Sequence, residues 1–278
     1  MTETISKLPD AAQIAARFVA ARRNAAAITT YPGEEPASMG DAYEVQEAAI
    51  RQWSDEIAGW KIGLVQPPYR ERFGALRIAG PIFRRQVQRA GDAPVDLPVI
   101  GGGFAAVEAE FVLRIGSAPR PDQRSWTPDQ AAAHADAMFI GVELAGSPFA
   151  AINDHGPAVT ASDFGNNAGL VLGPEVPGWE TLASLDLVAE TFIDGVSVGR
   201  GSAANIPGGP FAALAFIFEH CAQRGRALAP GMLISTGATT GVHVIAAGQS
   251  ARMSFGGFGE INCRAVDAAS ISARMGVA

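Results

Sequence analysis

Two glutamates separated by one residue occur in the run VEAEFVL, residues 107–113. In a β-strand, residues i and i+2 point to the same face, so Glu108 and Glu110 would project together, about 6–7 Å apart along the strand. Two carboxylates on a half-buried apolar face repel each other and lose hydration, and a divalent cation with oxygen ligands relieves both penalties. The spacing alone also allows an exposed strand face on which both carboxylates lie in water.

Glu143 lies in a second apolar, strand-like run, FIGVELAG. Combined with Glu108 and Glu110 it would complete a three-carboxylate site, with the remaining positions open to water and substrate. Such oxygen ligands suit magnesium, manganese or calcium. Zinc is less favoured, because no histidine or cysteine occurs at ligand spacing. Taken by itself, Glu143 could also belong to an exposed edge strand.

Lys61 is a candidate for a basic residue of the functional site, because it lies in GWKIGL, within a predicted strand over residues 58–64. A lysine in such a strand either extends its amine to the surface or is held there for function. Near a metal it could bind a substrate carboxylate or take part in proton transfer. Thr236 and Gly237, in LISTG, could offer a hydroxyl and a backbone N–H to an anion, or could form only a turn.

Two loops contain further candidates. Asp163 precedes a predicted strand in TASDFGNNAGLVLG, where aspartate and asparagine favour turns for conformational reasons alone. His155 lies in the polar loop NDHGP and is the histidine that best fits a functional role, although a loop histidine is usually just solvated. The glycine run at 101–103 precedes a strand and no helix, so it is not a dinucleotide-binding fingerprint.

Most of these candidate residues lie in predicted strands or in the loops beside them, so a β-rich part of the chain must position them. Helical spacing of apolar residues predicts helices over residues 10–28 and 38–53, and residues 1–60 are expected to form a helical N-terminal cap. From residue 61 to 278, short apolar runs alternate with glycine and proline, which is typical of many short strands. Two helices interrupt this part, one beginning at an N-cap at Thr127 and one over residues 210–223. The predicted fold class is α+β.

The composition excludes several classes of function. The 278 residues are 48% hydrophobic and carry a net charge of −7, which argues against nucleic acid and against an anionic membrane surface. The two cysteines fit neither a disulfide framework nor a zinc pattern, so a cytoplasmic setting is expected. No apolar run approaches the roughly 18 residues that span a bilayer. The segment MTETISKLPDAAQ lacks the features of a secretory signal.

The order of these segments resembles the 2-keto-4-pentenoate hydratases and 2-oxo-3-enedioate decarboxylases of the fumarylacetoacetate hydrolase superfamily. The resemblance covers nearly the whole chain. The matching runs are DAYEVQ (41–46), WKIGL (60–64), VEAEFVL (107–113), VEL (142–144), TASDFGNNAGLVLG (160–173), PFAALAFIFEH (210–220), ALAPGMLISTG (227–237) and SFGGFGEINCRAV (254–266).

The resemblance implies a mixed β-roll catalytic body of the fumarylacetoacetate hydrolase C-terminal type, assembled into homo-oligomers. It implies Mg²⁺ or Mn²⁺ held by Glu108, Glu110 and Glu143, with Lys61 beside the substrate. It also implies that Thr236 and Gly237 help to hold the carboxylate end of a small 2-oxo or 2-hydroxydienoic acid. The expected activity is that of a hydratase, a carbon–oxygen lyase of aromatic-compound catabolism, which acts on an acid such as 2-hydroxypenta-2,4-dienoate through a metal-bound enolate.

The sequence departs from the family pattern at two places. The stretch after the lysine, residues 73–83, has no acidic residue where hydratases usually carry one, and Arg77 is its only charge. The run LAGSP at 144–148 lacks the aspartate and arginine that often follow the third glutamate. Another group would then activate water, with His155 and Asp163 as the candidates.

Three other activities stay open. A 2-oxo-3-enedioate (4-oxalocrotonate-type) decarboxylase must accommodate a second carboxylate, and Arg77 could bind it. An acylpyruvate C–C hydrolase is less favoured, because that branch places a His–Glu dyad near the start of the catalytic domain and no histidine precedes His134. A catalytically silent homologue would only bind metal and an oxo acid.

Overall fold

A computed structural model describes residues 10–270 and shows an α+β fold in which helices surround two β-sheets. Residues 1–9, which hold most of the run MTETISKLPDAAQ considered as a secretory signal, lie outside the described residues. The α-helices are α1 (Ala11–Arg23), α2 (Met39–Gln52), α3 (Pro67–Phe73), α4 (Pro128–Ala132), α5 (Pro157–Ser162) and α6 (Gly209–Gln223).

The larger sheet has the strand order β2-β1-β10-β5-β6-β7-β3, with β11 also paired to β5, and mixes parallel and antiparallel neighbours. The smaller sheet has the order β4-β13-β12-β8-β9. The strands are β1 (Ile57–Leu64), β2 (Arg77–Phe83), β3 (Val87–Arg89), β4 (Val95–Val99), β5 (Phe104–Ile115), β6 (Ala135–Ser147), β7 (Asn167–Glu175), β8 (Val188–Ile193), β9 (Val196–Ser202), β10 (Leu233–Ser235), β11 (His243–Val244), β12 (Ser250–Ser254) and β13 (Glu260–Asp267).

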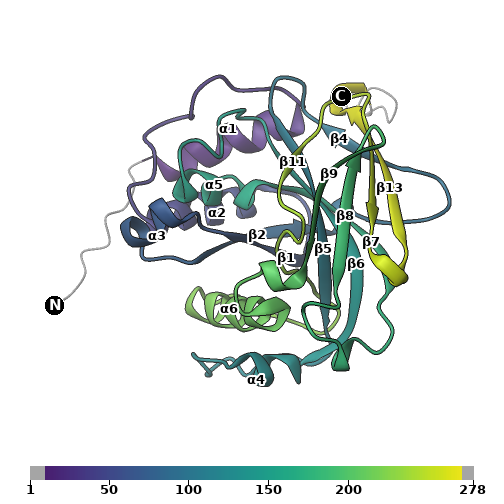
Figure 1. The fold of residues 1–278 in the computed structure, drawn as a ribbon. Coiled ribbons are helices and arrows are strands. Elements are labelled where there is room, and N and C mark those ends of the chain that lie inside the picture. The colour runs from purple at the N-terminus through teal and green to yellow at the C-terminus, as the bar shows by residue number, and fades with distance from the viewer. Residues whose placement is uncertain (1–9, 271–278) are drawn as a thin grey trace.

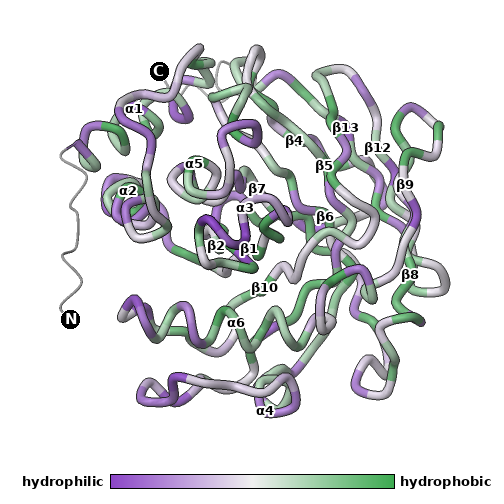
Figure 2. The backbone as a smooth tube through the Cα atoms, turned by 60° about the vertical axis from the view of Figure 1, so that its left-hand side comes forward, coloured by the Kyte–Doolittle hydropathy of each residue, from purple (hydrophilic) through white to green (hydrophobic). Residues whose placement is uncertain are grey.

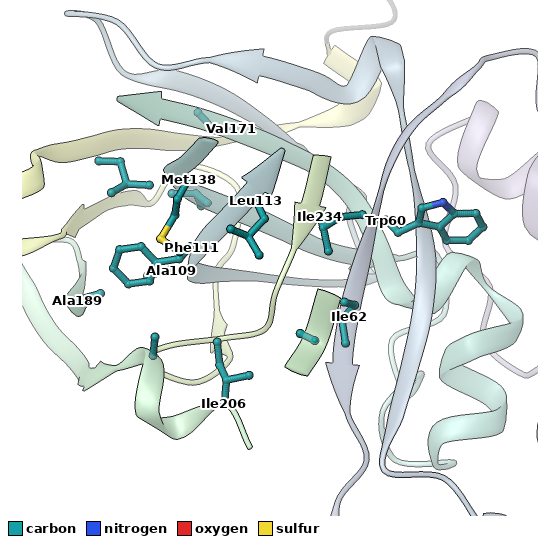
Figure 3. Close-up of a cluster of buried hydrophobic side chains, with 14 of the residues drawn as sticks. Trp60, Ile62, Ala109, Phe111, Leu113, Met138, Val171, Ala189, Ile206 and Ile234 are labelled. Atoms are coloured by element: carbon teal, nitrogen blue, oxygen red, sulfur yellow. The ribbon is translucent and has the colours of Figure 1, made fainter. Parts of the chain in front are cut away.

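The helices and the smaller sheet are arranged around the larger sheet. Figures 1 and 2 show α1, α2 and α5 on one side of the larger sheet, the strands of the smaller sheet on the other, and α6 with α4 below. The main hydrophobic core fills the space between the two sheets and α6, and Figure 3 shows Phe111, Leu113 and Met138 in it. In the described residues, no helix combines the length and apolarity that a membrane crossing requires.

Alternation along β5 and β6 separates a core face from a polar face. Val107, Ala109 and Phe111 point into the main core, as do their neighbours on β6. Glu108 and Glu110 therefore point to the opposite face of the larger sheet, because successive side chains of a strand alternate. The long strand predicted from VEAEFVL is confirmed by the twelve-residue β5.

Most of the predicted elements are present. Ser38 caps α2 through its side chain, and Thr127 caps α4 in a capping box with Gln130, as expected from their types. The predicted strand at 58–64 and the helix at 210–223 correspond to β1 and α6. The helices α3 and α5 were not predicted, because both are short and begin with proline in turn-rich sequence.

The first helix is shorter than predicted: α1 ends at Arg23, whereas apolar spacing extended it to residue 28. Ala25 has a positive φ of 48°, which an α-helix cannot continue through. Beyond it, the Ile28 backbone N–H donates to Pro148 and the residue pairs with Phe149 as a β-bridge. A backbone pairing with the loop after β6 therefore replaces the last turn.

Candidate metal and substrate site

The structure brings Glu108, Glu110 and Glu143 together. One carboxylate oxygen from each lies within 4.8 Å of the other two, and all three side chains are buried. The strand register explains the cluster, since Glu108 lies directly opposite Glu143 in the antiparallel β5–β6 pair. Glu110 projects from the same face two residues later.

The burial of three carboxylates in one place is costly without a cation. Burial first, and then the negative charge of Glu143, raises the pKa of Glu108 to about 8. The pKa of Glu110 is also raised well above its ordinary value for the same two reasons, with an added contribution from Glu108. In this environment Glu108 and Glu110 hold their protons at neutral pH unless a further positive charge joins them.

Lys61 supplies one positive charge to the cluster. Its Nζ atom lies 3.5 Å from Oε1 of Glu143, and the side chain is buried. Burial lowers the pKa of the Lys61 amine, but the opposing effect of Glu143, Glu108 and Glu110 is larger, so the pKa is raised overall. The amine therefore stays charged, yet one ammonium cannot balance three ionised carboxylates.

Hydrogen bonds from the protein engage one carboxylate oxygen of Glu110 and one of Glu143, and leave the other oxygen of each residue without a donor. Ser235 and the backbone N–H of Gly237 both donate to Oε2 of Glu110, at 2.6 and 2.9 Å. Asn167 donates to Oε1 of Glu143 at 3.0 Å. In contrast, Oε1 of Glu110 and Oε2 of Glu143 are buried with no hydrogen-bond partner. Buried oxygens left unpaired beside each other fit a hard divalent cation, which takes carboxylate ligands of this kind.

Glu108 and Lys61 also form part of the wall of a cavity of about 510 Å³, so the cluster opens into it. The wall is mostly apolar, and Lys61 and Arg77 are its cationic side chains. Its polar wall residues include Lys61, Arg77, Glu108, Asn153, Asn166 and Thr236. A cavity of this size, with few polar groups, is typical of a site for a small organic ligand.

Thr236 and Gly237 line the cavity, as the resemblance implied for substrate-binding residues. Their donors, however, already have acceptors in the protein. The Thr236 hydroxyl donates to the carbonyl of Phe111 at 2.7 Å, and the Gly237 N–H donates to Glu110. In this structure the turn supports Glu110, and neither the Thr236 hydroxyl nor the Gly237 N–H is free to bind an anion.

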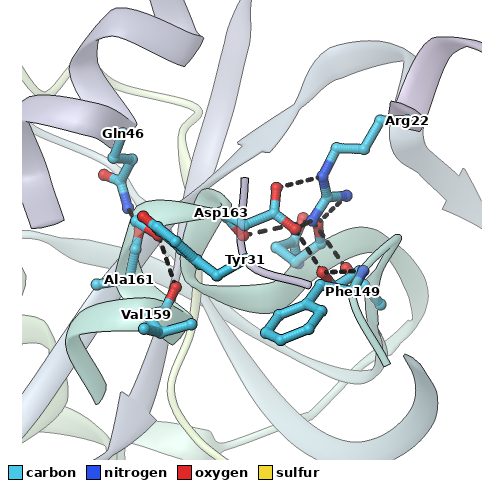
Figure 4. A network of polar contacts seen from close by, with 11 residues as sticks. Arg22, Tyr31, Gln46, Phe149, Val159, Ala161 and Asp163 are labelled. Atoms are coloured by element: carbon cyan, nitrogen blue, oxygen red, sulfur yellow. Dashed lines mark hydrogen bonds and ion pairs between the residues drawn. The ribbon is translucent and has the colours of Figure 1, made fainter. Parts of the chain in front are cut away.

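Neither candidate for water activation reaches the cavity. The Nδ1 atom of His155 lies 2.7 Å from Oε1 of Glu35, on a half-exposed outer surface, although its neighbours Asn153 and Gly156 line the cavity. Asp163 is buried, and both of its carboxylate oxygens accept hydrogen bonds from Arg22 (Figure 4). The structure therefore does not bring His155 to the site, and it shows Asp163 holding an arginine.

Asn166 is a cavity residue whose position the sequence alone did not reveal. It is buried, with a positive φ of 64°, and its Oδ1 atom has no hydrogen-bond partner. Phe164 and Gly165 before it also have positive φ values, of 53° and 60°. Such strain persists where the surrounding structure imposes it and is common at ligand sites. The DFGN sequence is compatible with an ordinary turn, so only the fold shows that this turn meets the cavity.

No family model matches the chain, and no curated protein matches it by sequence. Solved structures show the same fold. The chain is similar to 4-oxalocrotonate decarboxylase from Pseudomonas putida G7, complexed with magnesium and adipate, at 21% identity and a TM-score of 0.78 over 92% of this chain and 97% of that one. It is also similar to fumarylpyruvate hydrolase from Pseudomonas aeruginosa, in complex with Mn²⁺ and pyruvate, at 19% identity and a TM-score of 0.54 over 75% and 88%.

A third similar structure is 2-hydroxyhepta-2,4-diene-1,7-dioate isomerase from Mycobacterium marinum, at 19% identity and a TM-score of 0.54 over 77% of each chain. These matches confirm the predicted fold class, a mixed β-roll of the fumarylacetoacetate hydrolase type. At such identities they establish the fold, and the chemistry has to come from the residues of this chain.

Proposed function

We propose that this chain is a divalent-metal-dependent enzyme of the 2-keto-4-pentenoate hydratase and 2-oxo-3-enedioate decarboxylase family, and that it decarboxylates a small 2-oxo-3-enedioate of the 4-oxalocrotonate type. Glu108, Glu110 and Glu143 would hold Mg²⁺ or Mn²⁺. Their two unpaired buried oxygens support this assignment, and so does the binding of magnesium and manganese in enzymes of the same fold.

The lack of an ion pair at Arg77 is the observation that favours decarboxylation over the other reactions. Its guanidinium forms part of the cavity wall, is half-buried, and makes no ion pair with any carboxylate in residues 10–270; its hydrogen bond goes to the carbonyl of Pro207. Burial lowers its pKa, and no acidic neighbour offsets that effect. An unpaired arginine at a substrate cavity favours a ligand with a second carboxylate, since its planar fork matches that group.

Two cationic side chains then serve the two ends of a dicarboxylate. Lys61, on β1, lies beside the metal ligands and suits the 2-oxo acid end. Arg77 begins β2 and pairs with Leu64, three residues along β1 from Lys61, which is about 10 Å of strand. The adipate bound in the decarboxylase of the same fold is a dicarboxylate of comparable kind.

The reaction needs charge stabilisation more than a strong base. The carbon–carbon bond to the distal carboxylate breaks, carbon dioxide leaves, and the electron pair moves along the conjugated chain to the 2-oxygen, which takes up a proton. A divalent cation supplies a Lewis acid for negative charge on that oxygen. Lys61 keeps a proton and a positive charge at Nζ beside the carboxylates, so it can stabilise the same charge or donate the proton.

Hydration of a 2-hydroxydienoate such as 2-hydroxypenta-2,4-dienoate is the second candidate, and one observation favours it. The unpaired Oδ1 atom of Asn166 at the cavity wall can accept a hydrogen bond from a water molecule. Within the described residues, Glu108 is the acidic side chain of the cavity wall, and it belongs to the metal cluster. A hydratase would therefore have to activate water without a separate carboxylate.

The test is to purify the protein with Mg²⁺ or Mn²⁺ and to supply 4-oxalocrotonate, 2-hydroxypenta-2,4-dienoate and an acylpyruvate in separate assays. We expect carbon dioxide to be released from 4-oxalocrotonate. Loss of the dienoate absorbance without carbon dioxide would instead support hydration, and release of pyruvate would support hydrolysis. If none of the three substrates turns over, the proposal is wrong.

Arg77→Gln tests directly whether Arg77 binds the distal carboxylate of the substrate. Hydrogen bonds to charged groups contribute about 1.5–3 kcal/mol, so KM for the dicarboxylate should rise by about 10- to 150-fold. Binding of a monocarboxylate 2-oxo acid should stay unchanged, which serves as the internal control for damage to the cavity. Arg200→Gln, on the exposed side of β9, is the matched surface control and should change neither value. Equal losses for both ligands would exclude Arg77 as a carboxylate-binding residue.

A further inference from the structure

We infer that Asn167 is a positioning residue for the metal ligand Glu143, and that Arg22 of α1 holds Asn167 in place. This inference rests on the metal site of the proposed function. It assigns a role at that site to an N-terminal helix that contributes no side chain to the carboxylate cluster.

The first step is the contact between the two side chains. The Nδ2 atom of Asn167 donates to Oε1 of Glu143 at 3.0 Å, in a fully buried setting, and Lys61 lies 3.5 Å from the same oxygen. Both donors therefore engage one oxygen of Glu143 and leave the other, Oε2, without a partner. This arrangement fixes the rotation of the carboxylate and presents its free oxygen to the cluster.

A second observation comes from the backbone. Asn167 begins β7 at an irregularity in the β6–β7 ladder, where Leu144 pairs with Gly169 but Ala145 pairs with Asn167. One extra residue, Ala168, is accommodated in β7 between these pairs. A β-bulge redirects the side chains around it and is common beside active sites. Here it accompanies an amide that reaches Glu143 on the neighbouring strand.

Arg22 fastens this bulge from outside the sheet. Its guanidinium donates to the carbonyl of Asn167 at 3.0 Å and to the carbonyl of Gly146, on β6, at 2.8 Å. Asp163 accepts two hydrogen bonds of 2.6 and 2.9 Å from the guanidinium (Figure 4), and Ser147 also donates to Asp163. The arginine side chain is 5% exposed, so this is a buried ion pair tied to both strands.

A purely structural role explains the asparagine less well. Its Oδ1 atom is buried and has no hydrogen-bond partner. Leaving a buried polar atom unpaired is destabilising, so a position that served only packing would favour an apolar residue. Groups that donate to metal ligands are known to tune metal affinity, since they fix the orientation of the ligand.

The experiment measures Mn²⁺ binding by titration calorimetry and by electron paramagnetic resonance of the bound ion. Asn167→Ala and Asn167→Ser should each weaken Mn²⁺ binding by about 10- to 100-fold and change the resonance line shape. Arg22→Ala should act in the same direction. Urea unfolding of each variant without metal reports folding separately, so a folded variant with weakened Mn²⁺ binding is the supporting result.

Matched controls separate this role from general damage. Asn262→Ala removes another asparagine that donates to a glutamate, Glu260, on the exposed surface of β13. Arg23→Ala removes the next arginine of α1, whose partner is the carbonyl of Gln52. Both should bind Mn²⁺ as the wild type does.

Three results would overturn the inference, and they are distinguishable. If the wild type binds Mn²⁺ and the Asn167 variants bind it equally well, Asn167 does not position the ligand and the metal site stands. If the wild type does not bind Mn²⁺ at all, the proposed function fails together with this inference. If the Asn167 variants lose urea stability but keep the affinity and line shape, the residue is structural.

Discussion

The metal-free protein should lose stability as the pH rises from about 5 to about 8. Burial, and then Glu143, raises the pKa of Glu108 from an ordinary 4.5 to about 8 in the folded state. Between these values the unfolded chain has released a proton that the folded chain still binds, so unfolding becomes easier with rising pH. At about 1.36 kcal/mol per pH unit, the interval corresponds to about 5 kcal/mol, and the fall ends near pH 8.

Glu110 contributes in the same direction, because its pKa is also raised. The free energy of unfolding should therefore fall by up to about 2.7 kcal/mol per pH unit in the wild type, and by about half of that in Glu108→Gln. The assay is urea unfolding in the presence of a chelator at several pH values in this range. Glu260→Gln, which removes a half-exposed carboxylate of β13, should leave the wild-type slope intact.

Addition of Mn²⁺ should reverse the trend, since metal binding requires ionised carboxylates and becomes tighter as the pH rises. The decisive comparison is between the slopes of the metal-free proteins. Identical slopes for the wild type and Glu108→Gln would show that Glu108 does not retain its proton in the folded state. The electrostatic reasoning about the cluster would then be wrong.

Three further predictions concern the site and its support. Combined Glu108→Ala and Glu110→Ala should abolish Mn²⁺ binding by calorimetry; normal binding would exclude this cluster as the metal site. Gly80→Ala would place a Cβ atom 1.9 Å from the carbonyl oxygen of Phe164, so urea unfolding should show a loss of several kcal/mol, and an unchanged stability would mean that the turn moves freely. Phe111→Ala should cost about 3–5 kcal/mol but leave Mn²⁺ affinity unchanged, because the ring faces the other sheet.

The shared face of Glu108 and Glu110 could be predicted because strand periodicity is local. Alternation in VEAEFVL places Glu108 and Glu110 on one face whatever the rest of the fold does. Lys61 and Glu143 lie in equally apolar runs, and the structure brings both to the same cluster. The spacing did not reveal the register between β5 and β6, which sets Glu143 directly opposite Glu108.

The residues that reach the cavity from loops could not be predicted in this way. Asn166 and Asn167 are adjacent, yet one lines the cavity and the other meets Glu143, because of a left-handed turn followed by a β-bulge. His155 looked suitable by residue type, but its imidazole pairs with Glu35 on the outer surface. Loop directions depend on distant contacts, such as Arg22 with Asp163, that no local pattern encodes.

The direct pairing of Glu108 with Glu143 makes the β5–β6 ladder locally frustrated. Two ionised carboxylates opposite each other would disfavour the very register that brings them together. A slip of one residue would turn the carboxylates into the core, and a slip of two would separate them. The correct alignment must therefore be imposed by flanking apolar pairs, such as Val107 with Leu144 and Phe111 with Ile140, on the opposite face. Those core residues lie on the other face of the sheet from the carboxylates, yet their packing sets the register that brings Glu108 and Glu143 together.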